Sequence, residues 1–319
     1  MSAEVISIGR INVDVCMHVD SLPEANRHTM ASEGHISFGG SATNFAAQMA
    51  KLGMKVGLLG CVGDDLHGHQ IIKELSHLKV DTRSILVLEK QATGIFTIIQ
   101  DREGNRQIIV EPGANRFVEK QLLEDVPLSK TRTIHIAGGF PKIIDRAIEM
   151  TITNGMILSL DPGRAASNIE FGRVLPHTDL LFVNEEELKG YFGVEAREEA
   201  LKAFAKTFPG IVIVKRGIEG AIATDGFEYS VSRAFPVELV DTLGAGDSFA
   251  AGFITAWTRS ERLYQALNVA NATAAITVMK TGAHEGQPDL NETANFLAKH
   301  GVNIEPVLRT FRRRRKRRR

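Results

Sequence analysis

The chain has few cysteines, no long apolar run and no secretory pattern at its N-terminus. Its 319 residues contain only Cys16 and Cys61, too few for a disulfide framework or a cysteine metal cluster. No stretch approaches the roughly 20 consecutive apolar residues of a membrane-spanning helix. These absences predict a cytoplasmic protein without a membrane partner.

Three common catalytic motifs are also missing. The 10 histidines include no His-Glu-x-x-His pair, which makes a zinc site of that type improbable. The absence of Gly-x4-Gly-Lys-Ser/Thr argues against a P-loop kinase. Gly9 lacks a following Gly-x-x-Gly, which argues against a dinucleotide-binding dehydrogenase.

The net charge of zero conceals an uneven distribution. Eight consecutive basic residues occupy 312–319, and without them 30 basic residues stand against 38 acidic ones. We interpret residues 309–319 as a disordered, solvated basic tail, and nucleic acid is not the expected partner. A protein that binds nucleic acid through this tail is the alternative of a different class, because such a run would contact phosphates.

The most informative stretch is Asp241-Thr242-Leu243-Gly244-Ala245-Gly246-Asp247. It follows an apolar segment, 235–240, that we interpret as a strand, and it precedes an apolar helix over 248–257. Glycines allow a tight turn, and the free amides at a helix N-terminus suit a phosphoryl group. Asp247 could then accept a hydroxyl proton; the alternative is a simple turn with Asp247 as helix cap.

Strand and helix patterns alternate regularly from residue 133 to residue 214. This rhythm predicts a parallel sheet covered on both faces, with ligands at the carboxyl ends of the strands. Asn184, Lys215 and Asp247 all fall just after such ends. Asn184 and Glu187 could hold Mg²⁺ through their oxygens, or could form only a capping box. Lys215 could bind polyphosphate, or could be a solvated charge.

The first third of the chain contains a second glycine motif and two β-rich segments. Gly39-Gly40-Ser41-Ala42-Thr43-Asn44 opens a helix, and Asn44 offers hydrogen bonds to hydroxyl groups. The segments at about 10–38 and 85–112 are expected to pair as a small sheet that acts as a lid. Asp14 lies in the first of them, facing either solvent or a polyol.

The two glycine motifs, in this order and about 200 residues apart, resemble those of the ribokinase-like (PfkB carbohydrate kinase) family of sugar and nucleoside kinases. The resemblance covers about residues 3–300. It implies an α/β fold, a three-layer sandwich with a central, mostly parallel sheet and a small β-sheet lid, within a kinase domain at 1–308. It also implies phosphoryl transfer from ATP to a hydroxymethyl group, with Mg²⁺ and a monovalent cation such as K⁺.

The resemblance assigns roles to individual residues. Asp247 is similar to the catalytic base, and Gly244, Ala245 and Gly246 are similar to the anion hole. Residues at acceptor-binding positions are Asp14, Gly39, Gly40, Asn44 and Phe96. Residues at nucleotide-binding positions are Asn184, Lys215, Gly217, Thr224, Asn271 and Gly282. Asn184 and Glu187 match the magnesium motif, and Asp241 and Leu243 match the monovalent-cation loop.

One departure from the family concerns the acceptor. Ribokinase tends to place an acid after the strand that corresponds to 134–137, but Gly138-Gly139-Phe140 follows here, which puts ribose in doubt. Phe38, Phe96 and Phe140 could stack on a base, which would favour a nucleoside, or could be lid and core packing. The choice between ATP and ADP as donor is left open, and the lid sheet could pair across a homodimer.

Overall fold

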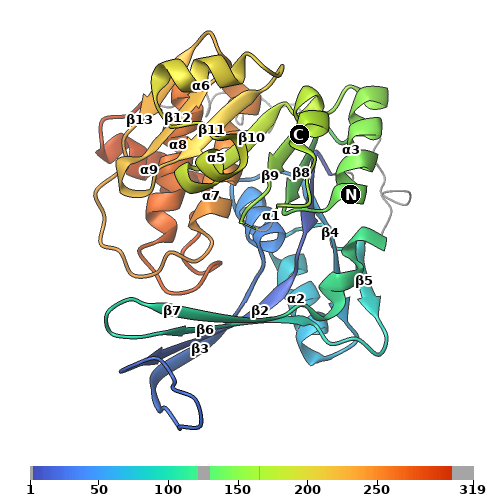
Figure 1. Cartoon of the computed structure of the whole chain (residues 1–319), viewed down its shortest axis with the longest axis vertical. Helices are drawn as coiled ribbons and strands as arrows, with labels where there is room; N and C mark the ends of the chain where they lie inside the picture. The colour runs from blue at the N-terminus through green and yellow to red at the C-terminus, as the bar shows by residue number, and fades with distance from the viewer. Residues whose placement is uncertain (1–2, 121–129, 165, 304–319) are drawn as a thin grey trace.

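The computed structural model describes residues 3–120, 130–164 and 166–303, and its largest element is a nine-stranded sheet (Figure 1). The strand order is β13-β12-β11-β10-β9-β8-β1-β4-β5. From β11 to β5 every neighbouring pair is parallel, whereas β12 and β13 run antiparallel at one edge. The strands are β1 (Val5–Gly9), β4 (Val56–Gly63), β5 (Ile85–Leu88), β8 (Thr133–Ala137), β9 (Ile157–Asp161), β10 (Leu180–Asn184), β11 (Ile211–Lys215), β12 (Ala221–Thr224) and β13 (Tyr229–Ser232).

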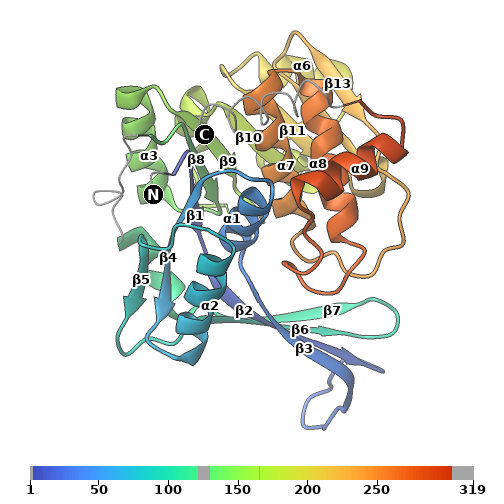
Figure 2. The same cartoon turned by 180° about the vertical axis from the view of Figure 1, so that it is seen from behind.

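Both faces of this sheet are covered because successive strand residues are apolar. In β10, Leu180 and Phe182 enter one hydrophobic core, and Leu181 and Val183 enter the other. Figures 1 and 2 show the two helical layers on opposite faces. The first layer contains α1 (Ser41–Lys51), α2 (Leu66–His77), α7 (Ala245–Ser260), α8 (Leu263–Thr277) and α9 (Leu290–Lys299). The second contains α3 (Pro141–Asn154), α4 (Phe171–Val174), α5 (Glu185–Phe192) and α6 (Glu198–Ala205), with the short helices η1 (Gly113–Lys120), η3 (Leu175–His177) and η4 (Gly217–Glu219). The three-layer α/β prediction is confirmed.

A separate four-stranded sheet projects from one end of this sandwich (Figure 1). Its order is β3-β2-β6-β7, and we call it the lid sheet: β2 (Asn12–Val19), β3 (Ala31–Gly39), β6 (Gly94–Gln100) and β7 (Arg106–Glu111). The expected lid segment 85–112 is wrong at its start, because β5 pairs with β4 in the main sheet. The lid sheet is therefore built from 12–39 and 94–111.

Two expectations from the sequence concern the periphery of the fold. Across 3–120, 130–164 and 166–303, none of the helices has the length and apolar character needed to cross a membrane. The basic tail, 309–319, lies outside the described residues.

Candidate active site

Three neighbouring parallel strands deliver charged and polar side chains to one edge of the sheet. β9 ends at Asp161, β10 at Asn184 and β11 at Lys215, and Asn184 and Lys215 are paired in register. The Lys215 Nζ donates to Asp161 Oδ2 at 2.6 Å. Asp161 was not among the residues predicted for the site, although its place at a strand end is the same signal that identified Asn184 and Lys215.

Lys215 is the cation at the centre of this edge. Burial would lower its pKa, but the attraction of Asp161, and then of Glu187 and Asp247, raises the pKa above its ordinary value. Lys215 therefore stays charged at neutral pH, next to three carboxyl groups. A cation held this way is suited to polyphosphate.

The central glycine motif brings Asp247 to the same place. Gly244, with φ +73°, caps α7 in the left-handed region, so the helix begins at Ala245 rather than at the predicted residue 248. A Cβ on Gly246 would lie 3.6 Å from the Lys215 Nζ, which places the ammonium beside the first turn of α7. Within the described chain, the amides of Gly246 and Asp247 have no hydrogen-bond acceptor. They are available to an anion.

The carboxylate of Asp247 is held by a residue 203 positions away in the chain. Asn44 Nδ2 donates to Asp247 Oδ2 at 2.9 Å, so the two glycine motifs meet at this bond. Burial, with a smaller contribution from Asp161, raises the pKa of Asp247 to about 7, against the opposing effects of Asn44 and Lys215. A carboxylate with this pKa can accept a proton near neutral pH.

The segment before the motif differs from the prediction. Residues 233–240 form no strand, and Leu239 and Val240 are 61% and 52% exposed. The segment has left the sheet after β13, and the Val240 amide donates instead to Val278 O at 2.8 Å. The apolar residues of this segment therefore do not belong to a buried strand.

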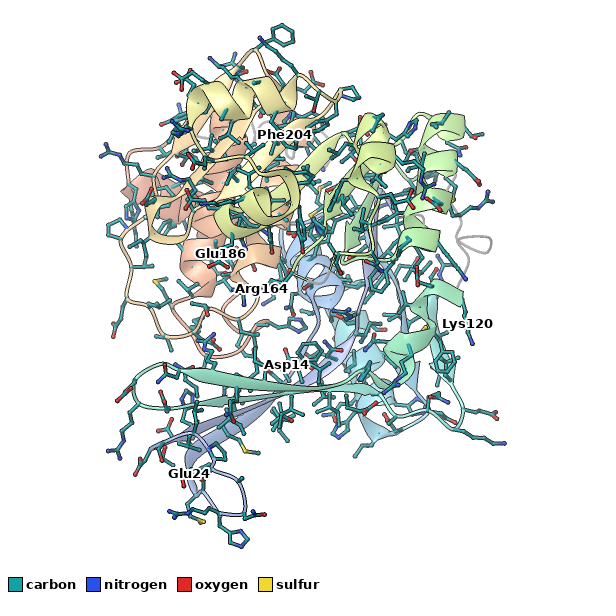
Figure 3. All side chains as sticks on the ribbon, viewed as in Figure 1. Asp14, Glu24, Lys120, Arg164, Glu186 and Phe204 are labelled. Atoms are coloured by element: carbon teal, nitrogen blue, oxygen red, sulfur yellow. The ribbon has the colours of Figure 1, made fainter. Side chains whose placement is uncertain are left out.

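On the lid side, Asp14 is buried and faces the main domain (Figure 3). A Cβ on Gly39 would lie 1.9 Å from Asp14 Oδ2, so Gly39 makes room for this carboxyl group. Burial, and then repulsion from Asp241, raises the pKa of Asp14 to about 7. Asp14 pairs in register with Ser37 on β3 and Phe96 on β6, so all three side chains share one face of the lid sheet.

Two buried polar atoms without partners in the described chain lie on this side of the site. Ser37 Oγ and Asn44 Oδ1 have no hydrogen-bond partner within the described chain, and the two residues are 6% and 3% exposed. Ser37 was not identified from the sequence, because a serine in a β-strand carries no distinctive signal. Unpaired buried polar groups are costly, so these atoms indicate a polar ligand.

The other two aromatic candidates do not lie on this face of the lid sheet. Phe140 is buried in the core with α3, and Phe38 pairs in register with Val13, on the opposite face of the lid sheet from Asp14. Only Phe96 among the three shares the face of Asp14.

Asn184 and Glu187 form the capping box that was the alternative to a magnesium site. Asn184 Oδ1 accepts from the Glu187 amide at 2.8 Å, and Glu187 Oε2 accepts from the Asn184 amide at 2.9 Å. This leaves Glu187 Oε1 without a partner inside the described ranges. Burial raises the pKa of Glu187. Glu187 can therefore cap the helix with Oε2 and still offer Oε1 to a metal ion.

The predicted nucleotide residues divide by position. Gly217 follows Lys215 at the same edge and is exposed, with φ +54°. Thr224 was expected there too, but it pairs with Val212 near the opposite end of β11. Its buried hydroxyl donates to Glu228 O at 2.6 Å. Because β12 runs antiparallel to β11, the carboxyl end of β12 lies at the edge of the sheet opposite Lys215. Thr224 therefore lies too far from Lys215 to belong to the predicted nucleotide site.

Two further predicted residues tie loops together. The Asn271 Nδ2 donates to Ser232 O at 3.0 Å and so anchors the chain after β13. The Asp241 carboxylate accepts from the amides of Leu243 and Gly282, both at 3.0 Å. Asp241 therefore joins the glycine motif to the loop after α8.

The sequence and the fold of this chain were compared with those of known proteins. The model for the pfkB family of carbohydrate kinases matches residues 2–290. An ATP-dependent ribose-1-phosphate kinase from Halopiger xanaduensis is 32% identical over 295 residues, covering 92% of this chain and 98% of the relative.

Two solved structures share the fold. A nucleoside kinase from Methanocaldococcus jannaschii superposes with a TM-score of 0.83 at 25% identity, over 94% of this chain and 100% of that one. An Escherichia coli protein solved with ATP and Mg²⁺ gives 0.82 at 28% identity, over 93% and 100%. On this evidence the chain belongs to the pfkB family of carbohydrate kinases.

Proposed function

We propose that this chain transfers the γ-phosphoryl group of ATP to a hydroxymethyl group of a sugar or nucleoside, with Asp247 as the general base. One observation carries the proposal. The Asp247 carboxylate, fixed by Asn44 at 2.9 Å, stands at the head of α7 beside unbonded amides and Lys215. A proton acceptor, Asp247, thus lies directly beside a site that can bind an anion.

The chemistry follows from that arrangement. Asp247 takes the proton of the hydroxymethyl group as its oxygen forms a bond to the γ-phosphorus, and the bond from that phosphorus to the ADP oxygen breaks. The amides of Gly246 and Asp247, together with Lys215, stabilise the charge on the transferring group. The lid sheet excludes water, so that the acceptor rather than solvent is phosphorylated.

The residues at the end of β10 fit a magnesium ion bound with the nucleotide. Glu187 Oε1 and Asn184 would hold it directly or through water, as is usual where Mg²⁺ binds few protein ligands plus phosphates. Bound there, Mg²⁺ would neutralise charge on the phosphates. Gly217, Asn271 and Gly282 complete the proposed nucleotide side, and Asp241 with Leu243 are the proposed monovalent-cation loop.

The acceptor side is supported by the unpartnered polar atoms. Asp14, Ser37 and Asn44 are buried, and they offer one carboxyl group, one hydroxyl group and one amide oxygen to a polyol. The hydroxyls of a sugar or of a nucleoside's ribose would pair with all three. Phe96, next to Asp14, would contact the ring.

The test is turnover by the Asp247→Asn variant. Wild-type protein is incubated with ATP or ADP, Mg²⁺ and a panel of sugars, sugar phosphates and nucleosides, and the nucleotide product is measured. Loss of the general base should lower kcat by about 10²–10⁴-fold while ATP binding is kept. Asp20→Asn, at an exposed lid site, is the control. Near-normal turnover by Asp247→Asn would contradict the assignment.

We also propose that two copies associate through the lid sheet, in the cytoplasm. Ile36, Val15, Thr97 and Ile109 form one row across all four lid strands, on the face opposite Asp14. Ile36 and Ile109 are 64% and 61% exposed. A second copy would cover this row by the same surface, as two-fold dimers do. Sedimentation of Ile36→Lys with Ile109→Lys should give a monomer where wild type gives a dimer.

A further inference from the structure

Arg10 is a cation at the acceptor end of the proposed site. It follows β1 directly, at the same sheet edge as the other site residues, and it is half-buried. Its guanidinium lies over the Phe140 ring, 5.8 Å from the centroid. Within residues 3–120, 130–164 and 166–303 its side chain has no ion pair and no hydrogen bond. Partial burial of an unpaired charge is costly unless a ligand supplies the partner.

The backbone places Arg10 against the start of α1. Its carbonyl accepts from Thr43 Oγ1 at 3.3 Å, and a Cβ on Gly40 would lie 2.3 Å from the same oxygen. The first turn of α1 has no capping side chain and no acidic residue. An anion next to Arg10 would therefore also meet the positive end of a helix dipole.

The same helix turn leads to the reacting centre. Asn44, in the first turn of α1, binds Asp247 through its nitrogen and presents an unpartnered, buried oxygen. Arg10, through its carbonyl, and Asp247, through Asn44, therefore both contact the first turn of α1. An acceptor bound at this turn would offer its hydroxymethyl group to Asp247 and another group to Arg10.

The neighbouring strand end adds no negative charge here. After β8 the chain continues as Gly138, Gly139 and Phe140, none of which carries a carboxylate that could pair with Arg10. Phe140 provides the surface on which the guanidinium rests. Carbon atoms beside an arginine leave its donors free for a planar or tetrahedral anion.

We propose that Arg10 binds an anionic group of the acceptor, so that the substrate is a sugar phosphate or a sugar acid rather than a neutral sugar or nucleoside. This inference rests on the proposed kinase function and specifies its acceptor. The transfer itself is unchanged: the hydroxymethyl oxygen gains the phosphoryl group, its proton passes to Asp247, and ADP leaves. The anionic group at Arg10 keeps all its bonds.

The experiment compares charged and neutral acceptors in wild type and in Arg10→Gln. Steady-state kinetics are measured with ribose 1-phosphate, ribose, a 2-dehydro-3-deoxy aldonic acid and adenosine. A charge-assisted hydrogen bond contributes about 1.5–3 kcal/mol, so KM for the anionic acceptor should rise about 10- to 150-fold in Arg10→Gln. The kcat should change little, and Arg10→Lys should restore part of the affinity. The matched control is Arg132→Gln, which removes an exposed charge just before β8, at the opposite edge of the sheet.

Separate outcomes test the two proposals. Preference of wild type for an anionic acceptor, lost in Arg10→Gln only, supports the inference; the phosphate and acid arms then identify the source of the charge. The inference is overturned if wild type uses neutral acceptors as well as anionic ones, or if Arg10→Gln raises KM equally for neutral and anionic acceptors. If no acceptor yields ADP, the kinase function fails. Calorimetric binding of ribose 1-phosphate against ribose then still decides the role of Arg10.

Discussion

Replacing Asp247 with asparagine should stabilise the protein while it removes activity. Burial raises the pKa of Asp247 from 3.8 to about 7 in the folded chain. A folded pKa above the unfolded value means that folding favours the protonated form. The resulting stability is fully present below pH 3.8, declines as pH rises, and is lost above about pH 7.

The magnitude follows from the size of the shift. About three pKa units at 1.36 kcal/mol each correspond to about 4 kcal/mol by which the ionised carboxylate destabilises the fold above neutral pH. Because Asp247 remains partly exposed to solvent, this is an upper bound. Asparagine has nearly the same shape, carries no charge and can still accept from Asn44.

The assay is the free energy of unfolding of both proteins from pH 4 to 8.5, by denaturant titration. The difference in favour of Asp247→Asn should grow between pH 4 and 7 and then remain constant. Asp20→Asn, 69% exposed in the native protein, should show no such trend. A difference that is flat across this range would refute the reasoning, because it would mean that the Asp247 carboxylate is not destabilised by burial.

The remaining predictions concern pH and packing. The kcat/KM should fall about tenfold per pH unit below about pH 7, because Asp247 must be ionised to accept a proton; a flat profile to pH 5.5 would exclude it as base. Gly39→Ala should remove acceptor binding with little change in ATP binding, since its Cβ would displace the Asp14 carboxyl; unchanged KM for the acceptor would contradict this. Burial lowers the pKa of His135 to about 3, so its contribution to stability is present above pH 6.5 and is lost as pH falls towards 3. The free energy of unfolding of His135→Gln should therefore fall less than that of wild type as pH is lowered from 6.5 to 3. An equal fall in both proteins would contradict the prediction that protonation of His135 destabilises the fold.

Structural elements that depend on local pattern were predicted well. The alternation of apolar runs and helical periods gave the parallel sheet, and strand ends gave Asn184 and Lys215, because both signals depend on short stretches of chain. The bond between Asn44 and Asp247 was not predictable in the same way. It joins residues 203 positions apart, and nothing local to either motif specifies that they meet.

The errors arise where pairing partners decide the structure. Thr224 lies at the wrong edge because β12 reverses direction against β11, and the sequence shows the hairpin but not its neighbour. The segment 235–240 resembles a strand, but β13 pairs only with β12 within the described sheet. A strand exists only if another strand accepts its hydrogen bonds.

A hydrogen bond near the tip of the lid sheet links the lid to the glycine motif. Arg106 Nη1 donates to Thr242 Oγ1 at 3.3 Å, and this bond is exposed to solvent. A bond of this kind in water is too weak to hold the lid against the motif on its own. If the acceptor binds as proposed, its contacts with Asp14 and Ser37 would supply most of the energy that holds the lid sheet over the site. A water molecule is too small to contact the lid sheet and the sandwich at once. Water alone would therefore not stabilise the closed lid, and the hydrolysis of ATP would be avoided.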